Sequence, residues 1–247
     1  MIIRDWFFQL DGLNLPCQAP CTMYSVLFGH GKIPDPFYGL NERELQHLGE
    51  KDCSFTAEFH VDDTLLAHEY IELTLGGIDT LCSIYLNGKR LARTKNMHRT
   101  YVFDVKNRLI PGKNRLKLEF SSPMRYFAEA QRRHYLYMND GDTLPGTAHL
   151  RKAMYQSGWD WGPTLPDMGI LRPVELKGYD TDRLDHVLVS QRHHDGVVDV
   201  DLRVSTAKNS DCDLVVLLDG KELRLTEGEG TIRVEAPRLW WVRGYGE

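Results

Sequence analysis

The segment SGWDWGP, residues 157–163, combines the side-chain types that bind sugars. Trp159 and Trp161 flank the carboxylate of Asp160, and glycine and proline restrict the segment to a turn-like path. Aromatic faces pack on the apolar C–H face of a pyranose, and a carboxylate accepts hydrogen bonds from neighbouring hydroxyls. A structural role fits the same residues, with buried tryptophans and Asp160 bonded to backbone N–H groups. The residue types leave both roles open.

Other reactive constellations are weaker. The adjacent His193 and His194 point to opposite faces of a strand and cannot easily chelate one metal ion. Residues 139–142 (NDGD) could hold calcium, but a solvated loop is the simpler interpretation because few oxygen ligands are assured. The sequence has no H-E-x-x-H, no G-x-S-x-G and no glycine-rich phosphate loop. We therefore expect no cofactor and no metal site.

Composition indicates an ordinary globular protein. The 247 residues are 42% hydrophobic and 26% charged, with a net charge of -5 and no basic patch, so neither nucleic acid nor a membrane is an expected partner. We see no secretion signal and no transmembrane span, which favours the cytoplasm. Five scattered cysteines contain no C-x-x-C. Cys82 and Cys212 lie in apolar, strand-like runs and are expected to be buried free thiols.

Alternation with a period of two dominates the first part of the chain. Apolar and polar residues alternate over 55–61, 71–75 and 115–120, which predicts half-buried strands. Asn87-Gly88 predicts a tight hairpin, because both residues tolerate positive φ. Strands in this number predict an all-β, jelly-roll-like (galactose-binding-like) sandwich with decorated loops.

Few helices are expected, and all are short. Asn41 resembles a cap for the RELQHL segment, and Ser122-Pro123 opens a second helix, where proline fits the first turn. A third helix is predicted within residues 20–28. These segments decorate the sandwich and do not alternate with its strands.

The pattern changes near Tyr179, which predicts domains at 1–179 and 180–247. The second stretch contains about five strand candidates with short connections. An immunoglobulin-like sandwich needs roughly 100 residues and seven strands. We therefore expect a partial immunoglobulin-like β-sandwich, incomplete at its C-terminal side.

The densest motif also carries a family resemblance. SGWDWGP, with LRKAMYQ before it and GILRPVEL after it, resembles the sugar-binding domain of glycoside hydrolase family 2 β-mannosidases. Three other stretches resemble the same family in the same order: GKIPDPFYGLNE, GGIDTLCSIYLNGKRLARTKNMHRTYVFDV and the final LWWVRGYGE. The chain departs from the family at Cys53, Phe55, Leu171 and Val242-Arg243, and none of these positions is Asp160.

The resemblance implies a non-catalytic role for this chain. A later (β/α)8 barrel would hold both catalytic glutamates, and a loop of the sandwich would complete the pocket for a terminal β-mannoside. Asp160 is the position expected to bind sugar hydroxyls, with Trp161 nearby, and Asn96 matches a position that approaches the same pocket. Trp159 and Lys152 are further candidates.

The chain itself lacks room for the chemistry. A barrel takes roughly 250 residues, and retaining enzymes need two carboxylates about 5 Å apart. Asn41-Glu42, the one Asn-Glu pair, is interpreted as part of a helix start. Two alternatives stay open: a free-standing carbohydrate-binding module, and a structural domain that docks other domains, as in a related β-galactosidase or β-glucuronidase.

Overall fold

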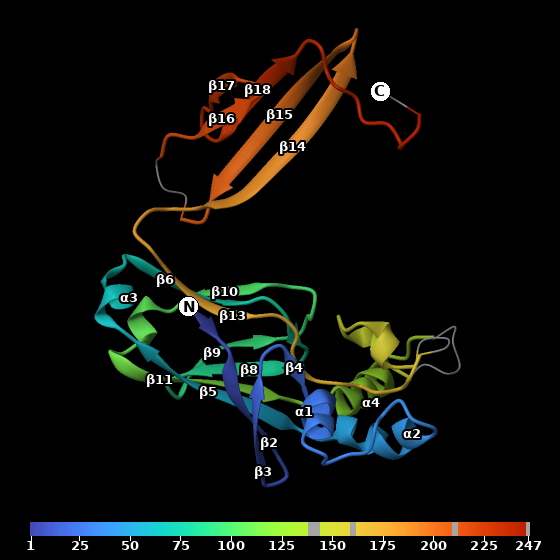
Figure 1. Cartoon of the computed structure of the whole chain (residues 1–247). Coiled ribbons are helices and arrows are strands. Elements are labelled where there is room, and N and C mark those ends of the chain that lie inside the picture. The colour runs from blue at the N-terminus through green and yellow to red at the C-terminus, as the bar shows by residue number, and fades with distance from the viewer. Residues whose placement is uncertain (138–143, 159–161, 209–211, 246–247) are drawn as a thin grey trace. The chain divides into compact units, whose positions relative to one another are not determined.

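The computed structural model describes residues 1–137, 144–158, 162–208 and 212–245. The chain divides into two compact units, Met1–Tyr179 and Asp180–Glu247. Strands predominate in both, which confirms the all-β fold class (Figure 1). Within the described ranges, no helix has the length and apolar character needed to cross a bilayer.

The first unit is a β-sandwich. Its larger sheet has six strands in the order β3-β2-β5-β11-β8-β9, and a second sheet has four in the order β1-β13-β6-β10. A small third sheet has the order β4-β12-β7. The strands of the first unit are β1 (Ile2–Ile3), β2 (Asp5–Leu10), β3 (Leu13–Gln18), β4 (Cys21–Thr22), β5 (Cys53–Val61), β6 (Tyr70–Leu75), β7 (Ile78–Asp79), β8 (Cys82–Leu86), β9 (Lys89–Thr94), β10 (Tyr101–Asp104), β11 (Gly112–Phe120), β12 (Gly169–Ile170) and β13 (Val174–Tyr179).

The core lies between the two larger sheets. The strands predicted from alternation are β5, β6 and β11, and their apolar positions point inward into one cluster. At its centre, Phe55 is fully buried, with ring centroids 5.1 Å from Phe8 and 5.6 Å from Phe120. Tilted and edge-on arrangements of this kind are the preferred geometry for aromatic pairs.

The predicted hairpin at Asn87-Gly88 is confirmed. Both residues have positive φ, 50° and 78°, and they join β8 to β9. The Asn87 amide also donates to the backbone oxygen of Arg108 at 2.9 Å and to Oδ1 of Asn114 at 2.8 Å. The turn is thereby fixed to the neighbouring strand β11, which sets the register of the sheet.

Short helices connect the strands. The α-helices are α1 (Met23–Gly29), α2 (Asn41–Leu45), α3 (Asp63–Ala67) and α4 (Pro123–Arg133), and the 3-10 turns are η1 (Gln46–Glu50), η2 (Lys106–Arg108), η3 (Thr147–His149) and η4 (Met154–Gln156). Ser122 caps α4 as predicted, accepting from the backbone N–H of Arg125 at 3.0 Å. The predicted cap at Asn41 is wrong: Leu40 precedes α2, and the Asn41 amide donates to the backbone oxygen of Asp35.

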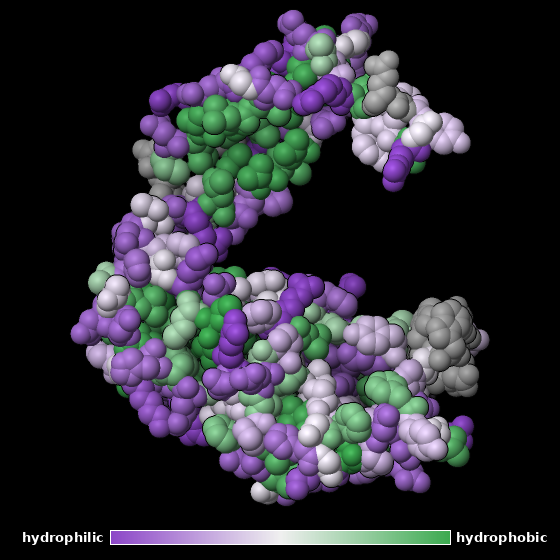
Figure 2. All heavy atoms as spheres, viewed as in Figure 1, coloured by the Kyte–Doolittle hydropathy of each residue, from purple (hydrophilic) through white to green (hydrophobic). Residues whose placement is uncertain are grey.

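The second unit contains two small sheets. Its strands are β14 (Leu184–His194), β15 (Val197–Thr206), β16 (Val215–Leu218), β17 (Lys221–Arg224) and β18 (Glu229–Val234), with sheet orders β14-β15-β18 and β16-β17. Val198, Val200, Leu202 and Ile232 form its small buried core. Figure 2 shows an apolar patch on this unit. Cys212 is exposed, contrary to expectation, because it precedes β16 and lies in no strand, whereas Cys82 is buried as predicted. The incomplete immunoglobulin-like assignment stays a prediction.

Replacing the central aromatic ring tests the core. Phe55→Ala should lower the free energy of unfolding by about 3–5 kcal/mol, because it removes a buried ring and leaves a cavity. Phe7 lies on β2 but is 48% exposed, so Phe7→Ala is the matched control and should change stability by less than about 1 kcal/mol. Urea unfolding measures both variants, and equal losses would contradict this account of the core.

Candidate functional site

The described residues on either side of the WDW motif form a closed neck. Ser157 and Thr164 form an antiparallel bridge, and the backbone N–H of Leu165 donates to Gln156 O at 3.0 Å. On the other side, the N–H of Leu144 donates to Ser157 O at 3.0 Å. Trp159, Asp160 and Trp161 lie outside the described residues. The structure therefore defines the base of the loop on which these three candidates stand.

A buried ion pair lies just before this neck. The Lys152 ammonium donates to both carboxylate oxygens of Asp79 at 2.7 Å, and their side chains are 2% and 0% exposed. A third bond, also 2.7 Å, runs from Lys152 Nζ to the backbone oxygen of Asp167. Burial lowers the pKa of Lys152, and the Asp79 carboxylate opposes that shift. All three ammonium protons are used inside the protein.

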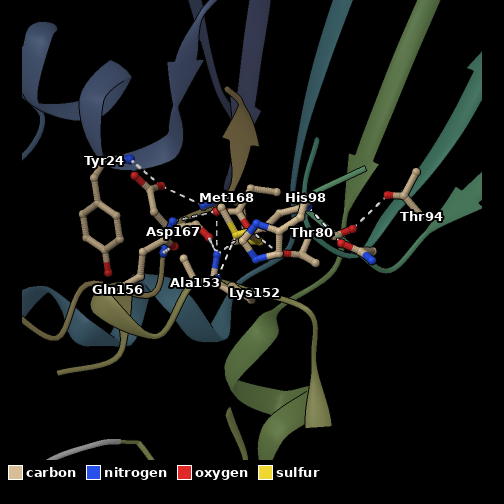
Figure 3. A network of polar contacts seen from close by, with 12 residues as sticks. Tyr24, Thr80, Thr94, His98, Lys152, Ala153, Gln156, Asp167 and Met168 are labelled. Carbon is tan, nitrogen blue, oxygen red and sulfur yellow. Dashed lines mark hydrogen bonds and ion pairs between the residues drawn. The ribbon is translucent and has the colours of Figure 1, made fainter. Parts of the chain in front are cut away.

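Gln156 and Asp167 extend the ion pair to both ends of the loop (Figure 3). Gln156 Nε2 donates to Asp79 at 2.8 Å, and its Oε1 accepts from the backbone N–H of Asp167 at 3.3 Å. Gln156 precedes the loop and Asp167 follows it, so one cluster holds the two chain segments that flank the loop together. We call Asp79, Lys152, Gln156 and Asp167 the anchor cluster.

Asp167 links the anchor cluster to α1. Its carboxylate accepts from the backbone N–H groups of Met168 at 2.8 Å and Tyr24 at 3.2 Å, and from the side chain of Thr22. Burial raises the pKa of Asp167 to about 6, an effect that these hydrogen bonds and Lys152 only partly offset. Thr22 also caps α1. The Asp167 carboxylate therefore accepts hydrogen bonds both from the start of this helix and from the segment that follows the WDW motif.

Asp79 is placed by the small third sheet. It ends β7, opposite Gly169 of β12, directly after the loop segment returns to the sandwich. The neighbouring Thr80 hydroxyl donates to the Asp79 carboxylate, and Thr94 Oγ1 donates to Thr80 O at 2.8 Å. Gly169 has no room for a side chain, because a Cβ there would lie 2.4 Å from Cys21 O. The close approach of β4 to β12 therefore fixes the position of Asp79.

The Asn96 segment runs beside the chain that leads into the loop. Asn96 and Arg151 form a parallel bridge, and the backbone N–H of Met97 donates to Arg151 O at 2.9 Å. The half-buried Asn96 side chain accepts from the N–H of His98 at 2.9 Å. The structure thus brings Asn96 next to the segment 151–153, which contains Lys152. Two candidates from distant parts of the sequence therefore lie in neighbouring segments.

The structure places the predicted site residues in different surroundings. Lys152 does not face solvent, because its ammonium is sealed against Asp79, which favours an internal, positioning contact over a direct contact with a sugar. Asp79, Gln156 and Asp167 were not among the residues predicted from the sequence. A carboxylate that follows the apolar run ending at Ile78 was the available signal for Asp79. Among the described residues, no group of three or more metal-binding side chains is close enough to hold a metal ion.

Known proteins resemble this chain over the unit that holds the candidate residues. The family model described as "Glycosyl hydrolase 2 galactose-binding domain-like" matches residues 6–172. The chain is 28% identical to the β-mannosidase of Mus musculus, covering 95% of this chain and 30% of that protein. It is 29% identical to β-mannosidase B of Emericella nidulans, covering 100% of this chain and 32% of that protein. The chain thus spans about a third of the length of these relatives.

Solved structures share the fold. The β-D-mannosidase of Dictyoglomus thermophilum superposes with a TM-score of 0.84 at 32% identity, covering 100% of this chain and 32% of that one. The exo-chitosanase CsxA of Amycolatopsis orientalis superposes with a TM-score of 0.66 at 18% identity, with 100% and 30% covered. The second likeness concerns the fold alone. The resemblance inferred from the sequence motifs is confirmed.

Removing one partner of the buried ion pair tests the anchor cluster. Lys152→Ala should lower the free energy of unfolding by about 3–5 kcal/mol, because it leaves the Asp79 carboxylate buried without a counter-charge. The double variant Asp79→Asn/Lys152→Met, which has no charge to bury, should recover part of that loss. Lys51→Ala removes the exposed pair with Asp11 and should change stability by less than about 1 kcal/mol. A double variant as unstable as Lys152→Ala would contradict the charge argument. Urea unfolding provides the measurement.

The pH dependence of stability tests Asp167. Its pKa is about 6 in the folded chain, above the ordinary value of 3.8, so the folded state holds the proton more tightly than the unfolded state. The contribution of Asp167 to stability therefore falls as pH rises between these two values. Asp167→Asn cannot ionise at this position, so its stability should lack this fall. The difference in unfolding free energy amounts to at most about 3 kcal/mol between pH 4 and pH 7. Unfolding free energies at both pH values provide the check. Parallel profiles for the two proteins would contradict it.

Proposed function

Because the chain belongs to the glycosyl hydrolase 2 galactose-binding domain-like family, we propose that it is the sugar-binding part of a β-mannosidase. In this role it contributes binding residues to a pocket for the terminal β-linked mannose. The β-mannosidase names of its relatives in mouse, Emericella nidulans and Dictyoglomus thermophilum support this substrate class.

The anchor cluster is the observation that carries the proposal. A loop that recognises a sugar gains affinity when its binding geometry is formed in advance, because no ordering is then needed on binding. Asp79 is bonded to Lys152 and Gln156 before the loop, and the backbone of Asp167 after the loop is bonded to both of those residues. A neck fixed at both ends suits a loop that presents a binding group.

Each candidate has a distinct role in this proposal. The Asp160 carboxylate accepts hydrogen bonds from neighbouring hydroxyls of the sugar, a charge-assisted contact. Trp161 and Trp159 supply aromatic faces for the C–H face of the ring. Asn96 contributes a polar side chain from the adjacent segment, which the bridge to Arg151 holds in place. Lys152 acts as a positioning residue through Asp79 and touches no substrate.

The bond-breaking groups belong to another part of the protein in this proposal. Glycoside hydrolysis needs an acid and a second carboxylate flanking the scissile bond. The buried carboxylates of Asp79 and Asp167 do not suit this task, because both are committed to hydrogen bonds within the anchor cluster. We assign the catalytic carboxylates to a separate (β/α)8 barrel, which would be the partner of this chain. The cytoplasmic location, and the expected absence of nucleic-acid and membrane partners, stay predictions.

Substituting Asp160 in the protein that carries both this chain and a catalytic domain tests the proposal. Asp160→Ala should lower kcat/KM for an aryl β-mannoside by on the order of 100-fold, because about 3 kcal/mol of charge-assisted hydrogen bonding is lost. The matched control is Asp63→Ala, on the exposed first turn of α3, which should retain wild-type kinetics. Thermal unfolding of both variants separates lost binding from lost folding.

Two outcomes would overturn the proposal. Wild-type kcat/KM in a folded Asp160→Ala variant would remove the binding role of the loop. Calorimetry of the isolated chain with mannose and manno-oligosaccharides addresses the other candidate function: we expect no binding at millimolar sugar, because half of a pocket offers few contacts. Binding at micromolar concentration would instead identify a free-standing carbohydrate-binding module.

A further inference from the structure

Two cysteine sulfurs meet at the edge of the first unit's core. Cys17 Sγ and Cys21 Sγ are 3.8 Å apart, and both residues are half-buried. Cys17 lies on β3, the edge strand of the six-stranded sheet, and Cys21 lies on β4 of the small third sheet. The two thiols therefore face each other from strands of different sheets, which a short connection joins along the chain.

The spacing suits a disulfide. A disulfide bond is about 2.05 Å long, so forming one requires the two sulfurs to approach each other by roughly 1.8 Å. The other cysteines are placed differently: Cys53 and Cys82 are 5% and 3% exposed in the core, and Cys212 is exposed in the second unit. Half-burial leaves Cys17 and Cys21 within reach of a small oxidant.

The two thiols are also chemically unequal. The Cys21 S–H donates to Cys17 Sγ, and this hydrogen bond lowers the pKa of Cys17. The same bond and burial raise the pKa of Cys21. Because the thiolate is the nucleophile, Cys17 is the sulfur that reacts first, and Cys21 is the neighbour that resolves the product.

We propose that Cys17 and Cys21 are a reversible oxidation site, at which a hydroperoxide converts the thiol pair to an intrachain disulfide. The Cys17 thiolate attacks the O–O bond of hydrogen peroxide, forms a sulfenic acid and releases hydroxide, which takes up a proton to become water. The Cys21 sulfur then attacks the Cys17 sulfur and expels a second water. Two thiols are oxidised by two electrons, and one peroxide is reduced to two waters.

The disulfide would tie the end of β3 to β4. Thr22 follows Cys21 directly, caps α1 and bonds to Asp167, and β4 pairs with β12 through Gly169 and Ile170. Oxidation would therefore link β4, which lies next to the anchor cluster, to β3 of the six-stranded sheet. This inference does not rest on the proposed sugar-binding role, because it depends only on the two thiols and their surroundings.

Thiol counting by mass spectrometry tests the site. The chain carrying Cys212→Ser, which removes the exposed thiol that could join two chains, is treated with hydrogen peroxide, unfolded and alkylated with iodoacetamide. Of the chain's five cysteines this background keeps four, so we expect four alkylated thiols before oxidation, two after it and four again after dithiothreitol. The proteolytic fragment holding Cys17 and Cys21 should lose the mass of two hydrogen atoms.

Cys17→Ser and Cys21→Ser in the same background are the matched controls. Neither should form an intrachain disulfide, and circular dichroism verifies that each is folded. Four alkylated thiols in the parent protein after peroxide treatment would overturn the proposal. A disulfide that survives in either control, or that involves Cys53 or Cys82, would overturn it equally.

Discussion

An ammonium and a carboxylate meet in the interior of the first unit, close to the neck that flanks the WDW motif, and the local structure depends on that contact. Removing two charges from water is strongly unfavourable unless they are paired closely and their remaining hydrogen-bonding capacity is used. Lys152 and Asp79 meet both conditions, with two bonds of 2.7 Å and side chains that are 2% and 0% exposed. Few arrangements of the neighbouring segments satisfy this requirement, so the pair selects one of them.

The consequence is that the residues on both sides of the WDW motif are bonded to one buried ion pair. Gln156 and Asp167 bring both ends of the loop to the ion pair, and Asp167 also holds the first turn of α1. The bridge between Asn96 and Arg151 adds a second segment to the same base. Preorganisation of this kind lowers the entropy lost when a ligand binds.

The second unit uses charge in a different way. Two of its ion pairs, Arg192 with Asp201 and Arg203 with Glu229, include side chains that are more than half exposed. Asp199, which pairs with Arg233, is the buried exception. Pairs in contact with water contribute little to stability, because solvent already screens and hydrates the charges. The sheets of this unit therefore depend on the apolar cluster around Val200 and Ile232, whereas the loop base of the first unit depends on a polar one.

The sequence by itself determined the features that depend on neighbours along the chain. Alternation set β5, β6 and β11, Asn87-Gly88 set a hairpin through positive φ, and Ser122 set the start of α4, because each rests on the intrinsic preferences of a few consecutive residues. The WDW motif with its flanks, together with three other stretches of sequence, indicated the family. Tertiary structure decided the pairing of Asp79 with Lys152, 73 residues apart. It also showed that Lys152 points inward, because only the packing of distant segments can surround a charge with protein acceptors in place of water.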